Sequence, residues 1–181
     1  PVCIGARSIN KDWFGLRLET VWSIMEDYLY FAHHAYQMRI HLFVLMSNHY
    51  HMIASFPEDN MAECMQYFQA QTGRQIAKPA GRINHVWRAK YFRSVIGNDH
   101  YFMNAYKYIY RNPVEAGVCK SVEDYRFSTL NGLLGATKLI IPIQSDQILF
   151  SNVEEKLSWL NTRPPDQYRE DMRRALRRGK F

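Results

Sequence analysis

Two apolar runs that are separated by only two polar residues constrain the fold of this chain most. The runs cover residues 39–46 and residues 49–56, and Ser47 and Asn48 lie between them. Runs of this length that are rich in Ile, Leu, Phe and Val are typical of strands, and a two-residue connection joins antiparallel neighbours. The sequence therefore predicts a β-hairpin at this point of the chain.

Amphipathic helices are expected on either side of the hairpin. After a first strand over residues 2–7, Thr20 is placed to cap a helix whose apolar residues recur at spacings of three and four. A second helix is expected after Pro57 and is ended by Pro79 and Gly81. The positions expected to face the core are Val21, Met25, Tyr28, Ala32 and Tyr36 in the first helix and Met61, Met65, Phe68, Thr72 and Ile76 in the second.

The chain after the second helix alternates again between strand and helix patterns. Residues 86–96 mix aromatic, β-branched and basic side chains, which favours one or two further strands. A third helix is expected to begin at Asn98 or Asp99 and to end near Asn112, because Pro113 restricts the residue before it. This order of elements is typical of an α+β fold, a ferredoxin-like sandwich in which helices pack on an antiparallel sheet.

Composition and charge limit the classes of function that the chain can have. With 181 residues, of which 47% are hydrophobic, the chain can bury one sizeable core. Its formal net charge of +6 favours a polyanionic partner such as nucleic acid, although solubility alone accounts for a moderate surplus equally well. Three widely spaced cysteines argue against a disulfide framework, and neither a membrane span nor a signal-peptide pattern is found. We therefore expect a soluble, cytoplasmic protein.

His49 and His51 form the first candidate site. On a strand, alternation directs both imidazoles to one face and Tyr50 to the other. Two imidazoles on one face can bind one metal ion, since histidine is the commonest metal ligand. Two solvent-facing histidines without a ligand have the same spacing, so the pair alone leaves both interpretations open.

Tyr108 and Asn112 form the second candidate site. In the third helix Phe102, Tyr106 and Ile109 make an apolar stripe, and at 100° per residue Tyr108 lies about 200° from Tyr106. Tyr108 therefore points away from this stripe, and Asn112 follows one turn later on the same face. A tyrosine in this position also suits simple packing against a neighbouring element.

Basic and aromatic residues are interleaved in a segment that begins at Trp87. The residues of this segment that are expected to contact DNA are Trp87, Arg88, Lys90, Tyr91 and Arg93. Aromatic rings stack on unpaired bases, and basic groups neutralise phosphates. An ordinary amphipathic strand gives the same mixture, with Trp87, Tyr91 or Phe92 filling the core. We expect some residues of each kind.

The C-terminal part of the chain has little periodicity. Residues 114–134 look irregular, and from Thr162 onward the chain becomes polar and rich in arginine. The residues of this tail that are expected to contact DNA are Arg173, Arg174, Arg177 and Arg178. A run of charge near a chain end is also typical of a solvated segment. We expect the tail to become helical when it is bound.

Three segments, taken in order, resemble the REP-associated tyrosine transposases, which are relatives of the small single-tyrosine insertion-sequence transposases. They are FVLMSNHYH at residues 43–51, WRAKY at residues 87–91 and YIYRNPVEAGV at residues 108–118, and DYRFST at residues 124–129 extends the match. The resemblance predicts a catalytic domain over residues 1–135 and a C-terminal extension over residues 136–181. Tyr50 departs from the pattern, since the family usually has a small aliphatic residue there.

The resemblance implies a mechanism and a set of site residues. It implies that His49, His51 and a polar residue of the third helix, by position Asn112, bind a divalent metal ion, Mg²⁺ or Mn²⁺. Tyr108 would be the nucleophile that attacks a DNA phosphodiester, forms a 5′-phosphotyrosine link and releases a 3′-hydroxyl. The implied partner is single-stranded or hairpin DNA in a bacterial cytoplasm.

Three functions follow from these features. The first is a transposase that cleaves and rejoins single-stranded DNA beside a short palindromic hairpin. The second is a domesticated, catalytically silent relative that binds structured DNA or RNA. The third is a phosphodiesterase that uses activated water, in which Tyr108 is structural. The sequence leaves the oligomeric state open between monomer and homodimer.

Overall fold

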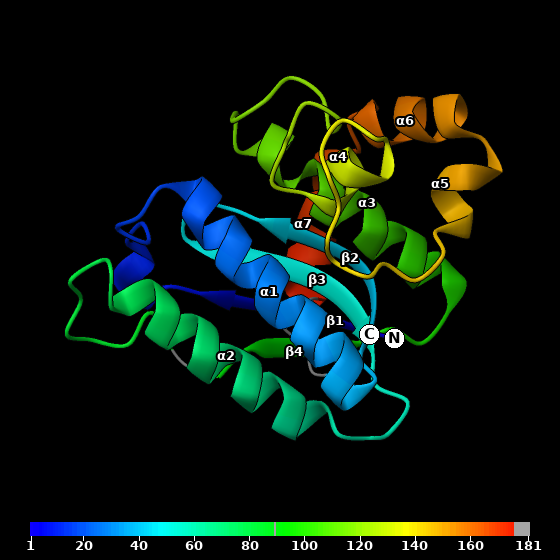
Figure 1. The fold of residues 1–181 in the computed structure, drawn as a ribbon. Coiled ribbons are helices and arrows are strands. Elements are labelled where there is room, and N and C mark those ends of the chain that lie inside the picture. The colour runs from blue at the N-terminus through cyan, green and yellow to red at the C-terminus, as the bar shows by residue number, and fades with distance from the viewer. Residues whose placement is uncertain (89, 176–181) are drawn as a thin grey trace.

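A four-stranded antiparallel sheet forms the centre of the computed structural model, which describes residues 1–88 and 90–175 (Figure 1). Its strands are β1 (Val2–Arg7), β2 (Arg39–Leu45), β3 (His49–Ser55) and β4 (Phe92–Val95). They lie in the order β2-β3-β1-β4, so β3 and β1 are central and the other two are edges. The pairing of β2 with β3 confirms the predicted hairpin.

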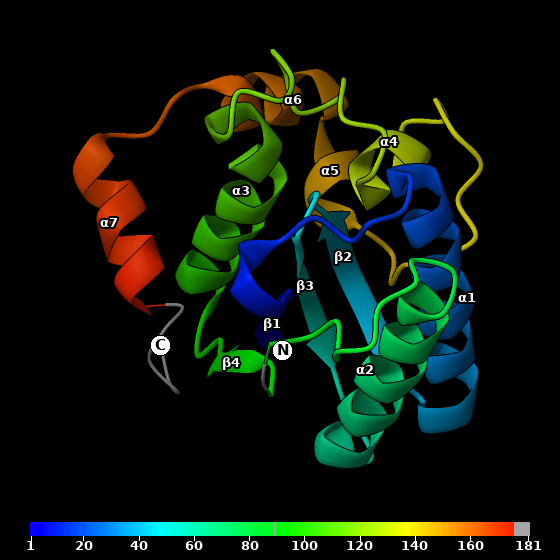
Figure 2. The ribbon, with the colours of Figure 1, turned by 90° about the vertical axis from the view of Figure 1, so that its left-hand side faces the viewer.

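Helices cover both faces of the sheet (Figure 2). α1 (Leu18–Tyr36) and α2 (Met61–Ala77) pack side by side on one face, and α3 (Asp99–Glu115) lies on the other. The shorter elements are η1 (Ile9–Lys11), α4 (Thr129–Leu133), α5 (Gln147–Ser151), α6 (Val153–Asn161) and α7 (Asp166–Ala175). This architecture confirms the predicted ferredoxin-like α+β class. No helix in the described ranges combines the length and the apolar character that a membrane span needs.

The predicted apolar stripe of α2 faces the sheet. All five predicted positions are buried, namely Met61, Met65, Phe68, Thr72 and Ile76. The helix ends at Ala77, directly before the segment that contains Pro79 and Gly81, as predicted. Periodicity alone was therefore sufficient to identify this element and the face that it buries.

The first helix begins earlier than predicted. Arg17 has the extended backbone of an N-cap, so α1 begins at Leu18 and Thr20 lies inside it. The expectation that Thr20 caps the helix is wrong. Of the predicted apolar positions, Tyr28 and Tyr36 are only half-buried, and their rings pack on Tyr67 of α2 rather than on the sheet.

α3 continues past the proline that was expected to end it. Asn98 caps the helix as predicted, because its side chain accepts a hydrogen bond from the amide of Tyr101 at 3.0 Å. The expectation that the helix ends near Asn112 is wrong, since it extends to Glu115 with a buried Pro113 inside. Pro113 lies in the last turn, so the helix loses a single hydrogen bond there and burial of the ring offsets that loss.

Residues 114–134 are more ordered than the sequence indicated, because they contain α4. Ser128 caps this short helix through its side chain. The hydroxyl of Thr129 lies 3.1 Å from that of Tyr110 and accepts the amide of Phe43 at 3.0 Å, so α4 joins α3 to β2. These bonds connect positions far apart in the chain, and they have no signature in local periodicity.

The C-terminal extension lies against α3. α6 and α7 both contact α3, and Figure 2 shows α7 beside it on the same side of the sheet. Tyr168 donates to the carbonyl of Asn104 at 2.8 Å, and Met172, one turn later, is buried. Two residues at this spacing pack one helix face, so contacts within the chain support the helical form of α7. This corrects the expectation that the tail becomes helical only when it is bound.

Tyr50 fills the core between the sheet and α2. Its side chain is fully buried, and its ring centroid lies 5.7 Å from that of Phe43, 5.8 Å from Phe68 and 5.3 Å from Trp87. Its hydroxyl is buried and has no hydrogen-bond partner within the described residues. The departure from the family pattern is therefore accommodated by aromatic packing.

Removing the Tyr50 hydroxyl is expected to leave stability unchanged or to raise it, because a buried oxygen without a partner costs about 1–3 kcal/mol. Tyr50→Ala should lower the free energy of unfolding by about 3–5 kcal/mol, because the ring leaves a cavity behind. Urea unfolding of Tyr50→Phe, Tyr50→Ala and the wild type measures both effects. A Tyr50→Phe variant that lost more than about 1 kcal/mol would show that the hydroxyl has a partner, such as a buried water.

Candidate active site

The two histidines of β3 lie on the sheet face that α3 covers. Across β1 their neighbours are Gly5 for His51 and Arg7 for His49, so these four residues point to the same side. The two imidazole centroids are 5.1 Å apart, and the ring planes are nearly perpendicular at 86°. Tyr50 points to the opposite side, into the core. The predicted alternation is confirmed.

Burial keeps both imidazoles neutral at neutral pH. His51 is 7% exposed, and burial, followed by the charges of His49 and Arg7, lowers its pKa well below the usual value. Burial and then Arg7 lower the pKa of His49 to about 4, while a hydrogen bond with Asn112 acts in the opposite direction. A neutral imidazole offers a lone pair to a metal ion, and an imidazolium does not.

Asn48 fixes the orientation of His49. Its side-chain oxygen accepts a hydrogen bond from Nδ1 of His49 at 2.7 Å, and its side-chain nitrogen donates to the carbonyl of Lys11 at 2.7 Å. With Nδ1 as the donor, the lone pair of the ring is on Nε2. In His51, Nδ1 is buried and has no hydrogen-bond partner among the residues that the structure describes. An unpaired buried nitrogen of this kind fits a site that binds a further ligand.

α3 brings Tyr108 and Asn112 to these histidines. The ring centroid of Tyr108 is 6.2 Å from that of His51, with the planes at 81°. Asn112, one turn later on the same helix face, hydrogen-bonds His49. Tyr106, by contrast, is buried on the core side of the helix. The structure therefore brings together the four residues that the sequence predicted for the chemical centre, and the predicted phase of α3 is confirmed.

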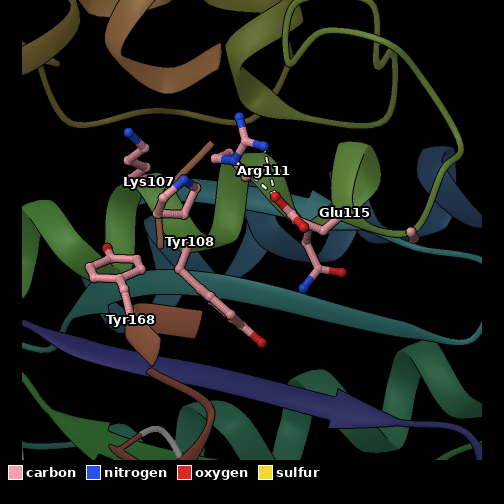
Figure 3. A pocket seen from close by; sticks show the side chains of 8 residues that line it. Lys107, Tyr108, Arg111, Glu115 and Tyr168 are labelled. Atoms are coloured by element: carbon pink, nitrogen blue, oxygen red, sulfur yellow. Dashed lines mark hydrogen bonds and ion pairs between the residues drawn. The ribbon is translucent and has the colours of Figure 1, made fainter. Parts of the chain in front are cut away.

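A small cavity of about 110 Å³ lies beside Tyr108, between α3 and the C-terminal extension (Figure 3). Its lining includes Lys107 and Asn112 of α3 and Tyr168 of α7. In Figure 3 the side chain of Tyr108 points from α3 toward the strands, whereas that of Arg111 points to the other side. The phenol is thus directed toward the sheet face that carries the histidines.

The two basic side chains next to this cavity, Lys107 and Arg111, both contact α6. The guanidinium of Arg111 pairs with Glu115 at 2.7 Å and donates to two carbonyls at the end of α6, at 2.9 and 2.7 Å. The ammonium of Lys107 lies 4.9 Å from the ring centroid of Trp159 in α6. Both groups are therefore engaged in attaching α6 to α3, and we assign them a structural role.

Gly5 makes room for an exposed ring next to His51. A Cβ at Gly5 would lie 2.3 Å from the ring of Phe92 in β4, so a larger residue would displace that ring. Phe92 is 37% exposed, and its centroid is 5.7 Å from that of His51. An exposed ring in this position is suited to stack on an unpaired base. The sequence left Phe92 open between filling the core and stacking on bases as part of the aromatic and basic segment, and it was not among the residues named as DNA contacts.

The aromatic and basic segment divides between core and surface. Trp87 and Tyr91 are 8% and 7% exposed, and the indole nitrogen of Trp87 donates to the hydroxyl of Thr72 at 3.1 Å. This burial corrects the expectation for stacking at the open surface, because both rings pack mainly in the core. The basic residues of the segment, Arg88, Lys90 and Arg93, are exposed and are available to phosphates.

The structure describes only part of the tail that was predicted to contact DNA. Arg174 is exposed and lies 3.4 Å from Glu170. Arg173 belongs to α7, but its side chain lies outside the described structure, and Arg177 and Arg178 lie outside the described residues altogether. Their role in DNA binding stays a prediction.

The donors present fit a divalent ion. Within residues 1–88 and 90–175, no three His, Cys, Asp or Glu side chains are grouped as a metal site. An ion at this place would have His49 and His51 as its imidazole ligands, and the amide of Asn112 is the side chain placed to be a third. Two imidazoles and an amide suit a divalent ion and leave coordination positions for a phosphate oxygen.

Arg7 is a site residue that sequence reasoning missed. It lies opposite His49 in the register of β1 and β3, and its charge contributes to the lowered pKa of both histidines. A guanidinium beside such a site is suited to bind a phosphate. The only sequence signal is an arginine two residues after Gly5. The pairing of β1 with β3, which places this arginine opposite His49, joins distant parts of the chain and cannot be read from local spacing.

A comparison with known families identifies the class of protein as a transposase. Residues 16–112, more than half of the chain, match the family of IS200-like transposases. This match includes both histidines, Tyr108 and Asn112. The chain therefore belongs to the IS200-like transposase family.

Two relatives have a more specific name. The chain is 28% identical over 98 residues to a putative REP-associated tyrosine transposase of Haemophilus influenzae, with 48% of this chain and 56% of that protein covered. It is 27% identical over 92 residues to a REP-associated tyrosine transposase of Escherichia coli K12, with 51% of this chain and 54% of that protein covered. The matched region spans about half the length of these relatives.

A solved structure has a similar fold. It is that of a REP-associated tyrosine transposase bound to a REP hairpin, and it matches with a TM-score of 0.61. The match covers 80% of this chain and 86% of that chain at 19% sequence identity. At this level of identity the likeness bears on the fold alone, and it agrees with the α+β class.

We expect wild-type protein to bind Mn²⁺ at one site, and a His49→Ala, His51→Ala double variant to bind it at least about tenfold more weakly. The reason is that the double variant removes both imidazole ligands. Isothermal titration calorimetry measures the affinities. His100→Ala removes an exposed histidine outside the site and should bind like the wild type. Equal affinity of the double variant and the wild type would show that His49 and His51 do not bind the metal ion.

Proposed function

We propose that this chain is a metal-dependent single-strand DNA endonuclease and transposase that cleaves and rejoins DNA through a 5′-phosphotyrosine intermediate. The observation that supports this most is the position of Tyr108, 6.2 Å from His51 between ring centroids and beside two neutral imidazoles. A phenol next to potential metal ligands is the arrangement that covalent phosphoryl transfer needs. Membership of the transposase family adds the biological setting.

The covalent step moves a phosphoryl group from one oxygen to another. The phenol oxygen of Tyr108 attacks the phosphorus of a phosphodiester, a new P–O bond forms, and the bond to the 3′ oxygen breaks. The phenol loses its proton and the departing 3′ oxygen gains one, so charge and atoms balance. Because one ester replaces another, attack by a 3′-hydroxyl on the phosphotyrosine reverses the step and joins a strand.

The residues around Tyr108 position the reacting groups. His49, His51 and Asn112 would hold the divalent ion, Mg²⁺ or Mn²⁺, which when bound polarises the scissile phosphate. Asn112 reaches His49 from the same face of α3 that carries Tyr108, so the helix places the nucleophile next to these donors. Arg7 places a positive charge beside His49, where it offsets the charge of the phosphate.

The proposed substrate is single-stranded DNA next to a hairpin. The solved relative is bound to a REP hairpin, and this chain shares its fold. Arg7 and Arg88 are exposed and adjacent, since the amide of Arg88 donates to the carbonyl of Arg7 at 2.9 Å. Exposed cations beside the site can follow a DNA backbone, and Phe92 offers a ring to an unpaired base.

Tyr108→Phe is expected to abolish both strand cleavage and the denaturant-resistant protein–DNA adduct, because it removes only the attacking oxygen. Binding of a hairpin oligonucleotide should stay within a few-fold of the wild type, since the ring remains. The measurement is denaturing electrophoresis of labelled hairpin DNA after incubation with Mn²⁺ or Mg²⁺.

Tyr106→Phe and Tyr110→Phe are the matched controls and should retain the adduct, because each variant keeps its buried ring on the core side of α3 and leaves the hydroxyl bond of the other tyrosine in place. Cleavage by Tyr108→Phe without an adduct would favour a phosphodiesterase that uses activated water. Binding without any cleavage by the wild type would favour a silent DNA- or RNA-binding relative.

Exposed cations near β4 are expected to contribute to DNA affinity through counterion release. Replacing Arg88, Lys90 and Arg93 by Gln removes up to three phosphate contacts. The slope of log affinity against log salt should then decrease by about 2 in magnitude, since each contact on a single strand contributes about 0.7. Fluorescence anisotropy across a salt series measures the slope. An unchanged slope would show that these three side chains do not contact the DNA phosphates.

A further inference from the structure

A second cavity, of about 500 Å³, lies between α2 and the loop of residues 82–87. It shares no lining residue with the cavity beside Tyr108. Ligand sites in proteins commonly have volumes of about 300–1,000 Å³, so its size suits a group as large as a nucleotide. The proposed chemistry makes no use of this cavity.

Short side chains of α2 open this cavity. Ala70, Gly73 and Ala77 recur at spacings of three and four, so they lie on one helix face. A Cβ at Gly73 would lie 3.5 Å from the indole of Trp87, which the hydroxyl of Thr72 holds at 3.1 Å. The floor of the cavity is thus apolar, and it is closed by Trp87, whose indole nitrogen is hydrogen-bonded to Thr72.

Polar groups surround this apolar floor. Arg74 and Arg82 line the cavity, and Arg82 is positioned by Asp12 at 3.5 Å and by a hydrogen bond to the carbonyl of Trp13 at 3.2 Å. Guanidinium groups recognise phosphates. The two arginines therefore provide the charge that a nucleotide needs.

Two amide side chains complete the lining. Asn84 is exposed on the loop, and Gln69 comes from α2. The side-chain nitrogen of Gln69 is buried, and in the described part of the chain it has no acceptor. A buried donor without an acceptor costs free energy, so this nitrogen suits an acceptor that a ligand supplies. Side-chain amides pair with the donor and acceptor groups of base edges.

The backbone of residues 86–88 connects this cavity with the candidate active site. Trp87 closes the cavity and pairs as an isolated bridge with Ser8, while Arg88 is exposed. The amide of Arg88 donates to the carbonyl of Arg7 at 2.9 Å, and Arg7 lies opposite His49. The cavity adjoins α2 and the histidines face α3, so they open on opposite faces of the sheet, and a DNA strand that reaches both would pass the two exposed arginines.

We infer that this cavity binds one unpaired nucleotide of the DNA substrate, with the base against Ile83 and the short residues of α2 and the phosphate on Arg74 and Arg82. Ile83 is fully exposed, and from the rim it can cover a bound base. A paired base cannot enter, so the cavity distinguishes DNA that has an unpaired nucleotide from a blunt hairpin. This inference rests on the proposed function.

Ala70→Leu fills the cavity from an exposed position, and Ala62→Leu makes the same change at an exposed position of α2 outside it. The probes are a blunt stem-loop DNA and the same stem-loop with a short unpaired flank, measured by fluorescence anisotropy. We expect the wild type and Ala62→Leu to prefer the flanked probe, and Ala70→Leu to bind it about tenfold more weakly. Affinity for the blunt probe should be the same in all three proteins.

Photocross-linking of a flank that contains 5-iododeoxyuridine gives a second readout. The wild type should cross-link within residues 82–87, and Ala70→Leu should not. The absence of such cross-links, or an unchanged preference of Ala70→Leu for the flanked probe, would overturn the inference. If the Tyr108 adduct still forms on the same DNA, the proposed function is unaffected by that result. A wild type that neither binds the stem-loop nor forms the adduct would refute the proposed function and the inference together.

Discussion

The antiparallel pairing of β1 with β3 is the interaction on which the site depends. It places Gly5 opposite His51 and Arg7 opposite His49, on the face that α3 covers. A slip of one residue would turn the histidines into the core and Tyr50 out of it. Because the ring of Tyr50 is fully buried, that slip would expose a large apolar surface. Core packing on one face of the sheet thus determines the chemistry available on the other.

The rotation of α3 about its own axis is the second constraint. The hydroxyl of Tyr106 donates to Asp146 at 2.7 Å, and Asp146 also caps α5. The hydroxyl of Tyr110 lies 3.1 Å from that of Thr129 in α4. These buried bonds come from segments that follow α3 in the chain, and they fix which face of the helix meets the sheet. The position of Tyr108 next to the histidines therefore depends on the C-terminal part of the fold.

The features that the sequence predicted correctly are those set by local periodicity. Spacing within one element was sufficient to predict the hairpin, the buried face of α2, the shared face of His49 and His51, and the position of Tyr108 off the apolar stripe of α3. The errors concern features that depend on contacts with residues far away in the sequence. The length of α3 past Pro113 and the folding of α7 depend on packing between elements. No spacing within one element indicates either feature.

Local spacing also did not predict which of the rings of Trp87, Tyr91 and Phe92 is exposed. Alternation alone allowed any of these rings to face the core, and only the pairing of Phe92 with Gly5 across β1 and β4 sets the phase. Tyr50 is likewise placed by the core. Its side chain packs on Phe68 and Trp87 and points away from the histidines, so its size is set by the core rather than by chemistry. A tyrosine where the family usually has a small residue is therefore compatible with an intact site, and it gives no support to a silent relative over an active nuclease.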